Sequence, residues 1–243
     1  SLLFQPTFNS RNWSGELTAF EIDESVTLDQ EKWRASEQLP THSARKIYSH
    51  NASIGIEFKH ANLSSQQQAL ISSDQVEYIR GERSEEQANN GVFRNRSSLL
   101  GDIIHSTPTL DSQLDYGFDA LAGSEGTSYS TFRSTTAYQN RTNALYFGAN
   151  DGMLHALNAN TGAELFPYIP GTTMEDLSAY SSPTYQHKFF VDGEVTIADA
   201  YLSGSWKTVL VGSRGRGGST IFALDISDPD SFSAADVLWE ISA

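Results

Sequence analysis

The sequence of 243 residues contains no cysteine and only two methionines. The absence of cysteine excludes a disulfide framework, a thiolate nucleophile and a cysteine-ligated zinc site. It leaves the cellular compartment open. Any chemistry in this chain must therefore come from carboxylates, imidazoles, hydroxyls and amides.

Basic residues are also scarce, since sixteen Lys and Arg stand against thirty Asp and Glu, for a net charge of −14. This charge opposes binding to a phosphate backbone or to an anionic membrane surface, and so argues against nucleic acid as a partner. No apolar run approaches the roughly 20 residues of a membrane-spanning helix. Residue 1 does not begin a signal peptide, so we expect a mature portion or an excised piece of a longer protein.

What the sequence does contain is strands joined by tight turns. Between Ala144 and Pro170, apolar residues alternate with more polar or smaller ones on both sides of Asn150-Asp151-Gly152, whose residues tolerate positive φ. A second turn, Asn160-Thr161-Gly162, precedes a strand from Glu164 to Ile169 that is rich in aromatic and β-branched residues. This stretch predicts a β-meander of three strands.

The same pattern of strands and turns recurs, which indicates a repeat architecture. A second copy runs through Thr208–Gly212, Thr220–Asp225 and Val237–Glu240, and a fainter copy runs from Gly15 to Asp23 and on to Trp33. Repeated elements of this kind bury one another's faces, as the blades of a β-propeller do. The fold prediction is an all-β β-propeller, and the alternative is three unrelated hairpins in a sandwich.

Five ordered motifs cover most of the chain: Leu100–Pro108, Gly148–His155, Tyr185–Gly193, Trp206–Gly212 and Ala223–Pro229. Together they resemble the C-terminal propeller of the PilY/PilC family of type IV pilus-associated proteins. Their number and order make the match specific, whereas any one of them would be weak. The resemblance implies presentation outside the cell, where such proteins prime pilus assembly, counter retraction and contribute to surface adhesion.

We expect one partial propeller domain over residues 1–243, with about three blades and insertions at about 34–99 and 111–143. About three blades cannot close a ring of the usual four to eight. The first copy lacks an inner strand. In many closed propellers, such an incomplete blade is completed by strands from the far end of the chain. The aromatic residues of 111–143 predict a folded insertion, and connections of this length are usually functional or disordered.

Several local elements are also predicted. Leu2–Phe8 contains a proline and suits an edge strand. Ser73–Gly81 predicts a short helix with Ser73 as N-cap and Gly81 as its stop. Ile103–Leu110 and Val195–Leu202 are candidate inner strands, and Glu82–Asn90 is predicted to be a mobile surface loop.

The glycine-rich loop Gly212–Gly218 follows a strand, as phosphate-binding loops do. It matches neither G-x-G-x-x-G nor G-x-x-x-x-G-K-[ST], and a strand follows instead of a helix. We therefore predict a tight turn between strands. Arg214 and Arg216 would then form an exposed basic spot that offers a contact for a carboxylate.

No segment matches a calcium loop, which needs several carboxylate oxygens converging from one stretch. Asp225, Asp228 and Asp230 come closest, but each can cap its own loop. Asp151 and Asp192 precede glycine, and turn chemistry explains them. Members of the resembled family often carry a calcium loop in the propeller. Its pattern is missing here, so no cofactor is predicted for this segment, while calcium stays open for the full-length protein.

The histidines show no metal-pair spacing, and no G-x-S-x-G elbow is present. They are His42, His50, His60, His105, His155 and His187. His155 alternates within a strand and is interpreted as a structural histidine. No catalytic, cofactor-binding or metal-binding residue is predicted, although residues that meet only in the fold escape this reasoning.

The leading functional hypothesis is a non-enzymatic module for type IV pilus biogenesis and tip adhesion, located from the periplasm to the pilus tip. A rigid disc would present 34–99 and 111–143 to minor pilins or to a host or abiotic surface, because binding residues collect on loops of rigid scaffolds. Two alternatives remain. One is a quinoprotein-like dehydrogenase, whose blade repeats look similar, and the other is a carbohydrate-binding propeller, supported by the aromatic content.

Overall fold

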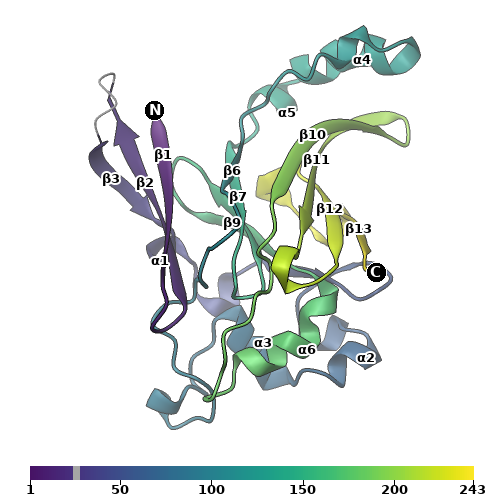
Figure 1. Cartoon of the computed structure of the whole chain (residues 1–243). Helices are drawn as coiled ribbons and strands as arrows, with labels where there is room; N and C mark the ends of the chain where they lie inside the picture. The colour runs from purple at the N-terminus through teal and green to yellow at the C-terminus, as the bar shows by residue number, and fades with distance from the viewer. Residues whose placement is uncertain (24–27) are drawn as a thin grey trace.

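A computed structural model describes residues 1–23 and 28–243, whose strands form three sheets (Figure 1). The N-terminal sheet has the order β1-β2-β3, the central sheet β5-β4-β9-β8-β7-β6 and the C-terminal sheet β10-β11-β12-β13. The N-terminal strands are β1 (Leu2–Asn9), β2 (Ser14–Ile22) and β3 (Leu28–Arg34). The central strands are β4 (Tyr48–His50), β5 (Gly55–Glu57), β6 (Thr109–Asp111), β7 (Ala144–Gly148), β8 (Leu154–Asn158) and β9 (Glu164–Ile169). The C-terminal strands are β10 (Val195–Leu202), β11 (Ser205–Ser213), β12 (Ile221–Asp225) and β13 (Val237–Ile241).

Most of the predicted strands are confirmed, including the edge strand β1 with its proline and the strands β9 and β10. In the fainter copy, the connection between Asp23 and Trp33 includes residues 24–27, which lie outside the described part of the chain. The inner strand predicted at Ile103–Leu110 is wrong for most of its length, because β6 starts only at Thr109. Upstream of β6, the His105 N–H donates to a side chain of another loop, Asp192, instead of to a strand.

The same irregularity occurs at the same place in all three sheets. The register shifts directly after Ala19 in β2, Ala156 in β8 and Ala223 in β12. Each alanine pairs with a larger apolar residue on both neighbouring strands, and paired residues share one face of a sheet. The trios are Phe4–Ala19–Trp33, Tyr146–Ala156–Phe166 and Val211–Ala223–Trp239. We call the face that carries each trio the trio face.

Each trio face, except the last, is covered by the following sheet. Ala19 and Trp33 pack in one core cluster with Leu145 and Phe147 of the central sheet, and Trp33 Nε1 donates to the Ala159 carbonyl at 3.2 Å. The trio face of the central sheet packs in a second cluster with the C-terminal sheet. That cluster joins Tyr146, Ala156 and Phe166 to Leu210, Phe222 and Leu224.

The trio face of the C-terminal sheet is exposed instead. Val211, Ile221, Trp239 and Ile241 retain between 37 and 56% of their accessible surface. Ile221 and Ile241 pair directly and lie two residues from Ala223 and Trp239, so all four belong to this face. In the part of the chain that the structure describes, no further sheet follows β13.

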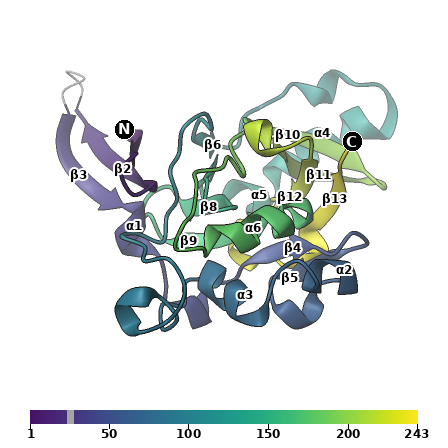
Figure 2. The same cartoon turned by 60° about the horizontal axis from the view of Figure 1, so that its bottom comes forward.

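The two insertions lie at opposite ends of the sheets (Figure 1). Residues 111–143, which we call the arm, carry α4 (Gly123–Ser134) and α5 (Thr136–Gln139). Residues 34–99, which we call the base, carry α1 (Ala35–Gln38), α2 (Ser65–Gln68) and α3 (Ser73–Arg80). Figure 2 brings the base end forward and shows α6 (Met174–Tyr180) beside it. Short 3-10 turns are η1 (His42–Ala44), η2 (His60–Asn62), η3 (Gln87–Asn89), η4 (Phe118–Ala120), η5 (Gly171–Thr173), η6 (Gly215–Gly217), η7 (Pro229–Ser231) and η8 (Ala234–Asp236).

The chain is therefore mixed, and the all-β prediction is wrong for the insertions. The sequence of α4 is rich in Gly, Ser and Thr, which are weak helix formers, so packing must stabilise this helix. The helix predicted at Ser73–Gly81 is confirmed, but its N-cap is Ser72, which forms a capping box with Gln75. Gly81 ends it at φ 119°. Within the described residues, no helix is both long and apolar enough to cross a membrane.

Candidate functional site

The motifs Leu100–Pro108, Gly148–His155 and Tyr185–Gly193 meet at the base end of the sheets, in what we call the junction. The Asp102 carboxylate accepts a hydrogen bond from Asn150 Nδ2 at 2.7 Å and lies 2.9 Å from His187 Nε2. Asn150 Oδ1 accepts the Phe190 N–H at 2.9 Å. Burial raises the pKa of Asp102, while the bonds from Asn150 and His187 oppose this shift. One buried carboxylate thus ties together three distant segments.

A second junction carboxylate, Asp192, holds His105. Its Oδ1 accepts the His105 N–H at 3.1 Å, and its Oδ2 pairs with His105 Nδ1. The His105 side chain is 40% exposed, so this pair has the elements of a general base. In residues 1–23 and 28–243, no hydroxyl is hydrogen-bonded to His105 that could serve as a nucleophile. The prediction that Asp192 serves a local turn is wrong for its side chain, since both carboxylate oxygens contact His105.

The third junction carboxylate, Asp151, acts both within its turn and across segments. Its Oδ1 accepts the Met153 N–H at 3.1 Å, as the predicted turn requires. Its Oδ2 accepts the Gly101 N–H at 2.9 Å and lies 3.0 Å from His155 Nε2. Burial opposes its ionisation, but His155 outweighs this effect and the pKa of Asp151 is lowered.

His155 is fully buried within β8 and lies at the centre of an ionic cluster. Its Nδ1 lies 3.8 Å from Glu164 Oε1, within ion-pair but beyond hydrogen-bond distance. Glu164 forms a two-point contact with Arg45, at 2.6 and 2.9 Å. Burial lowers the pKa of His155, yet Asp151 and Glu164 outweigh it and raise the pKa to about 9. For Glu164, burial acts in the opposite direction and raises the pKa. Arg45 and His155 outweigh it and lower the pKa of Glu164 to about 2.

The described residues contain no group of three or more His, Asp or Glu side chains arranged to hold a metal. Two of the three predicted loop-capping aspartates act as expected. Asp225 Oδ1 accepts the N–H and the hydroxyl of Ser227, and Asp228 caps the N–H of Ser231. For Asp230 the capping role stays a prediction.

The predicted exposed basic spot is wrong for Arg214, which is 6% exposed. Its Nη2 contacts Asp176 Oδ2 of α6 at 3.0 Å, and its Nε donates to the Phe190 carbonyl at 3.4 Å. The expected contact with a carboxylate is thus made within the chain. Arg216 is exposed, as predicted. The glycine-rich loop is a connection between β11 and β12, as its spacing indicated.

The arm is attached to the C-terminal sheet by buried polar contacts. The Asp199 carboxylate of β10 accepts hydrogen bonds from the hydroxyls of Tyr129 at 2.9 Å, Tyr138 at 3.2 Å and Thr208 at 2.7 Å. Arg141 donates to Thr208 at 2.6 Å and pairs with Asp111 at 2.9 Å. These contacts fix both ends of the arm to β10 and β11.

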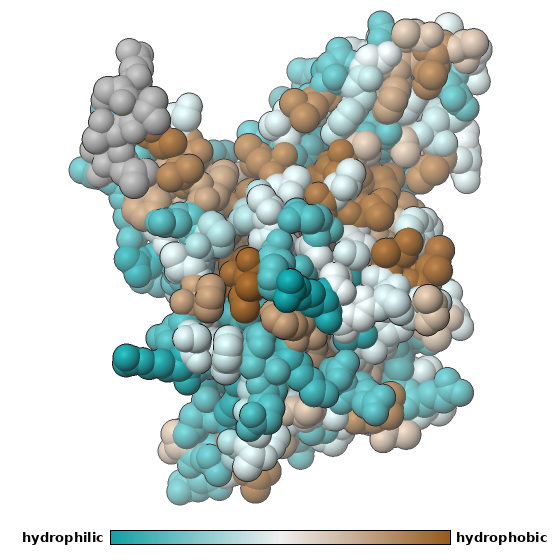
Figure 3. Space-filling model, in the orientation of Figure 1, coloured by the Kyte–Doolittle hydropathy of each residue, from teal (hydrophilic) through white to brown (hydrophobic). Residues whose placement is uncertain are grey.

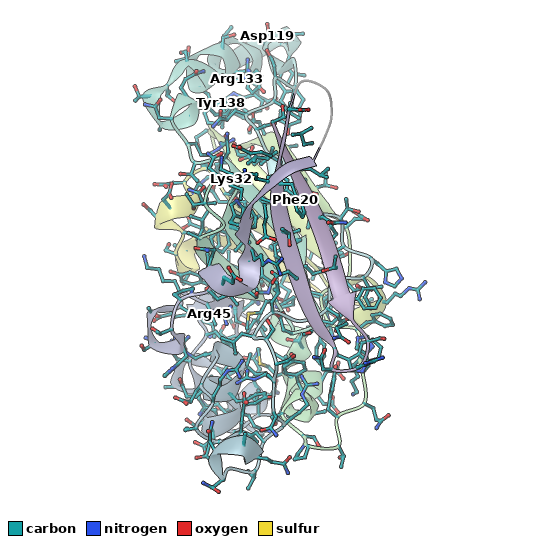
Figure 4. All side chains as sticks on the ribbon, turned by 90° about the vertical axis from the view of Figure 1, so that its left-hand side faces the viewer. Phe20, Lys32, Arg45, Asp119, Arg133 and Tyr138 are labelled. Carbon is teal, nitrogen blue, oxygen red and sulfur yellow. The ribbon has the colours of Figure 1, made fainter. Side chains whose placement is uncertain are left out.

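Most of the arm beyond these contacts is exposed. Leu114 and Leu121 are 58 and 45% exposed. In Figure 3 hydrophobic and hydrophilic surface alternate along the arm, and in Figure 4 Asp119 lies near its outer end. The inner side carries aromatic rings that pack around Trp206 of β11. The arm is therefore a folded projection with a fixed inner side and an open outer side.

The base is a folded layer with its own core, in which Leu63, Ile71 and Val76 pack with Ile169 and Leu177. It also extends the central sheet, because β4 pairs with β9 in parallel. This pairing could not be expected from local sequence, since it joins segments about 120 residues apart.

Buried ion pairs also hold the base together. Glu86 is 3% exposed and pairs with Arg96 at 2.9 Å, so the predicted surface loop at Glu82–Asn90 is wrong at this residue. The Arg96 guanidinium lies 3.5 Å from the centre of the Tyr78 ring. Charged side chains are almost never fully buried unless paired, which explains why neither partner could be recognised alone.

Repeated sheets that pack face to face and are tied at one end by buried carboxylates define a sheet-repeat scaffold. A family model described as the PilY1 beta-propeller domain matches residues 100–243 of this scaffold. This match covers more than half of the chain, and the chain belongs to that family.

Two relatives support the assignment along nearly the whole chain. A type IV pilus biogenesis factor PilY1 homolog of Xylella fastidiosa is 38% identical over 99% of this chain and 19% of its own length. The type IV pilus biogenesis factor PilY1 of Pseudomonas aeruginosa strain PAK is 36% identical over 98% of this chain and 22% of its own length. The chain spans about a fifth of the length of these relatives.

One solved structure is also similar in sequence. The crystal structure of the Pseudomonas aeruginosa PilY1 C-terminal domain is 39% identical where it aligns, over 47% of this chain and 21% of that chain. The TM-score is 0.36, which is too low to support an argument about the fold.

Proposed function

We propose that this chain supplies three consecutive blades of a β-propeller in a non-enzymatic type IV pilus biogenesis factor. Five relatives that carry this name are 32–38% identical over nearly the whole chain. The protein acts beyond the cytoplasm, from the periplasm to the pilus tip at the cell surface. The chain itself forms one partial propeller domain over residues 1–243, with the base and the arm as insertions.

The order in which the sheet faces pack is the observation that supports a propeller ring. The trio face of the N-terminal sheet meets the opposite face of the central sheet, and the trio face of the central sheet meets the opposite face of the C-terminal sheet. Units that stack with the same face always forward generate a ring or a solenoid, whereas a sandwich pairs two like inner faces. This arrangement supports blades over unrelated hairpins.

The exposed trio face of the C-terminal sheet is the place for a further blade. Val211, Ile221, Trp239 and Ile241 correspond by register to residues that are covered in the two preceding sheets. A contiguous exposed apolar patch of this kind marks an interaction surface. At the other end, β1 is an edge strand, and no inner strand lies beside it among the residues that the structure describes.

The arm is the contact surface for minor pilins or for a host or abiotic surface. Its inner side is fixed to β10 and β11, while its outer side exposes apolar and polar residues together. We rank the base below the arm as a contact surface, because much of the base is buried against the sheets.

Paired surface variants test this ranking in a strain that depends on the protein. The arm variant combines Leu114→Ser with Thr131→Lys, and the base variant combines Leu70→Ser with Gln66→Lys. All four residues are exposed, so neither pair disturbs the core. We expect the arm variant to lower surface attachment and piliation at an unchanged protein level, and the base variant to retain both.

Two outcomes would count against the proposal. Normal attachment and piliation in both variants would remove the arm as a contact surface. Deletion of the whole gene with no effect on piliation, twitching or attachment would overturn the pilus role itself.

A further inference from the structure

An open surface pocket of about 240 Å³, which we call the cavity, lies between the arm and the β10–β11 hairpin. Phe118, Leu121 and Glu125 line it from the arm, and Asp199, Tyr201 and Trp206 line it from the hairpin. Pockets for drug-sized ligands occupy about 300–1,000 Å³, so this volume suits a small chemical group.

The aromatic wall of this cavity is held in place. The Trp206 indole N–H donates to the Glu125 carbonyl at 3.2 Å and to Ser128 Oγ at 3.0 Å. Phe118 stacks on Trp206 with ring centres 5.5 Å apart, and Tyr201 meets Trp206 edge-on at 5.4 Å. Phe118 and Tyr201 are only half-buried, so part of each ring remains open to the cavity.

The charge of the cavity is negative and is not balanced within the described part of the chain. Asp199 is 4% exposed, and its hydrogen bonds come from three neutral hydroxyls. Neither Asp199 nor Glu125 takes part in any ion pair of the described residues. Buried carboxylates normally have a cationic partner, and hydroxyl donors stabilise a charge without neutralising it.

The arginines of the arm do not fill this role. Arg133 pairs with Asp115 at 2.7 Å, and Arg141 pairs with Asp111 at 2.9 Å. Arg141 also donates to Thr208 Oγ1, which in turn donates to Asp199, so this guanidinium reaches the Asp199 carboxylate only through a bridging hydroxyl. The acidic surplus of the whole chain, at a net charge of −14, attracts cations in addition.

We infer that this cavity binds the charged end of a small alkylammonium group, with Phe118, Tyr201 and Trp206 against the cation and Asp199 and Glu125 as its counter-charges. Aromatic rings attract ammonium groups through their negative faces, and desolvation strengthens the contact. Choline and the lysine side chain share this chemistry. The inference does not depend on the ring or on the pilus role.

Saturation-transfer NMR on the complete protein tests the inference with three small molecules. They are choline, Nα-acetyl-lysinamide, and 3,3-dimethylbutan-1-ol, which is a neutral isostere of choline. We expect at least one of the two cations to bind about tenfold or more tightly than the neutral alcohol, and added salt to weaken that binding. A stronger response to choline assigns a quaternary ammonium group, and a stronger response to acetyl-lysinamide assigns a lysine side chain.

Three variants locate the binding. Glu125→Gln removes an exposed carboxylate from the cavity, and Tyr201→Leu removes one ring; each is expected to weaken cation binding about 3- to 10-fold. Asp119→Asn is the matched control, because it removes an exposed carboxylate from the same arm but outside the cavity lining. Near-UV circular dichroism verifies that the aromatic cluster stays intact in each variant.

Three results would overturn the inference. One is equal binding of the cations and the neutral alcohol, which would mean that the cavity selects apolar shape alone. Another is the absence of saturation transfer to either cation. The third is cation binding that Asp119→Asn weakens as much as Glu125→Gln does, with the fold of both variants intact.

Discussion

Glu164 shows how single charged residues hold this chain together. Its side chain is 2% exposed and contacts Arg45 of the base while facing His155 of the central sheet. Asp102, Asp151 and Asp192 play equivalent parts at the junction, each joining segments that are distant in the sequence. A buried ion pair adds little to stability when compared with apolar packing. Removing one partner, however, leaves the other charge buried without compensation, which is strongly destabilising.

Glu164→Gln should therefore destabilise the protein strongly. The substitution keeps the shape of the side chain but leaves Arg45 and His155 buried with one carboxylate fewer. We expect a loss of about 3–5 kcal/mol in the free energy of unfolding. Chemical denaturation measures it.

The matched control is Glu57→Gln, which removes the carboxylate of an ion pair with Lys59 whose side chains are 44 and 52% exposed. An exposed pair contributes about 1 kcal/mol or less. Equal effects of the two substitutions would contradict a buried ionic cluster at Glu164.

His155 makes stability depend on pH in the alkaline range. Its pKa is about 9 in the folded chain and 6.5 in the reference state, because Asp151 and Glu164 favour the imidazolium. The imidazolium of His155 therefore stabilises the folded state fully below pH 6.5. This stabilisation is lost as the pH rises through 9, and the loss in the free energy of unfolding is about 3 kcal/mol. No cysteine is present to titrate in this range.

Denaturant unfolding at a series of pH values measures this loss. His155→Gln should flatten the profile between pH 6.5 and 9, since glutamine does not titrate. A wild-type profile without a slope in this window, or an unchanged slope in the variant, would refute the charged state of His155.

Residue roles were only half predictable from the sequence. The Asp-Gly pair identifies Asp151 correctly as a turn residue, because turn chemistry is local, whereas Asp192 uses both carboxylate oxygens to contact His105. Their partners Gly101 and His105 lie 50 and 87 residues away, and no local pattern encodes such contacts. The same limit hid Arg214, whose glycine-rich surroundings indicated an exposed loop.

The interface between the N-terminal and central sheets depends on close backbone approach at one turn. A Cβ on Gly162 would lie 2.6 Å from Trp33 Cδ2, and Gly162 has φ +76°. Gly162→Ala therefore adds an overlap to the backbone strain, and both effects push the two sheets apart. We expect a loss of about 2–5 kcal/mol, measured by thermal or chemical unfolding.

Gly204→Ala separates the two causes. Gly204 lies in the β10–β11 turn at φ +88°, and a Cβ there would meet nothing within 4 Å. This control suffers strain alone, of about 1–2 kcal/mol. If both substitutions cost the same, Trp33 does not pack on Gly162 as the structure has it.

Strands were more predictable than helices at this scale. Residue composition and turn residues revealed β9 and β10, and the repeated pattern revealed β12, although the structure buries most residues of β9 and β12. The helix α4 left no such signal, since its stability comes from Tyr129 and Phe132 packing near Trp206. The short β6 was overestimated because loop contacts use the backbone donors before it.

At the scale of the whole molecule, three sheets succeed one another with the same face forward. The repeat was visible in the sequence as spaced copies of one pattern, and the shared register shifts after Ala19, Ala156 and Ala223 give it a structural counterpart. The extension of the central sheet by the base was not visible, because the β4–β9 pairing links distant segments. The arm and the base then occupy opposite ends of the stack (Figure 1).

The most direct test of the proposed ring is an experimental structure of the complete protein. We predict that the three sheets lie around one axis as neighbouring blades, and that a further sheet covers Val211, Ile221, Trp239 and Ile241. A structure in which this face stays open to solvent, or in which the three sheets share no axis, would contradict the account.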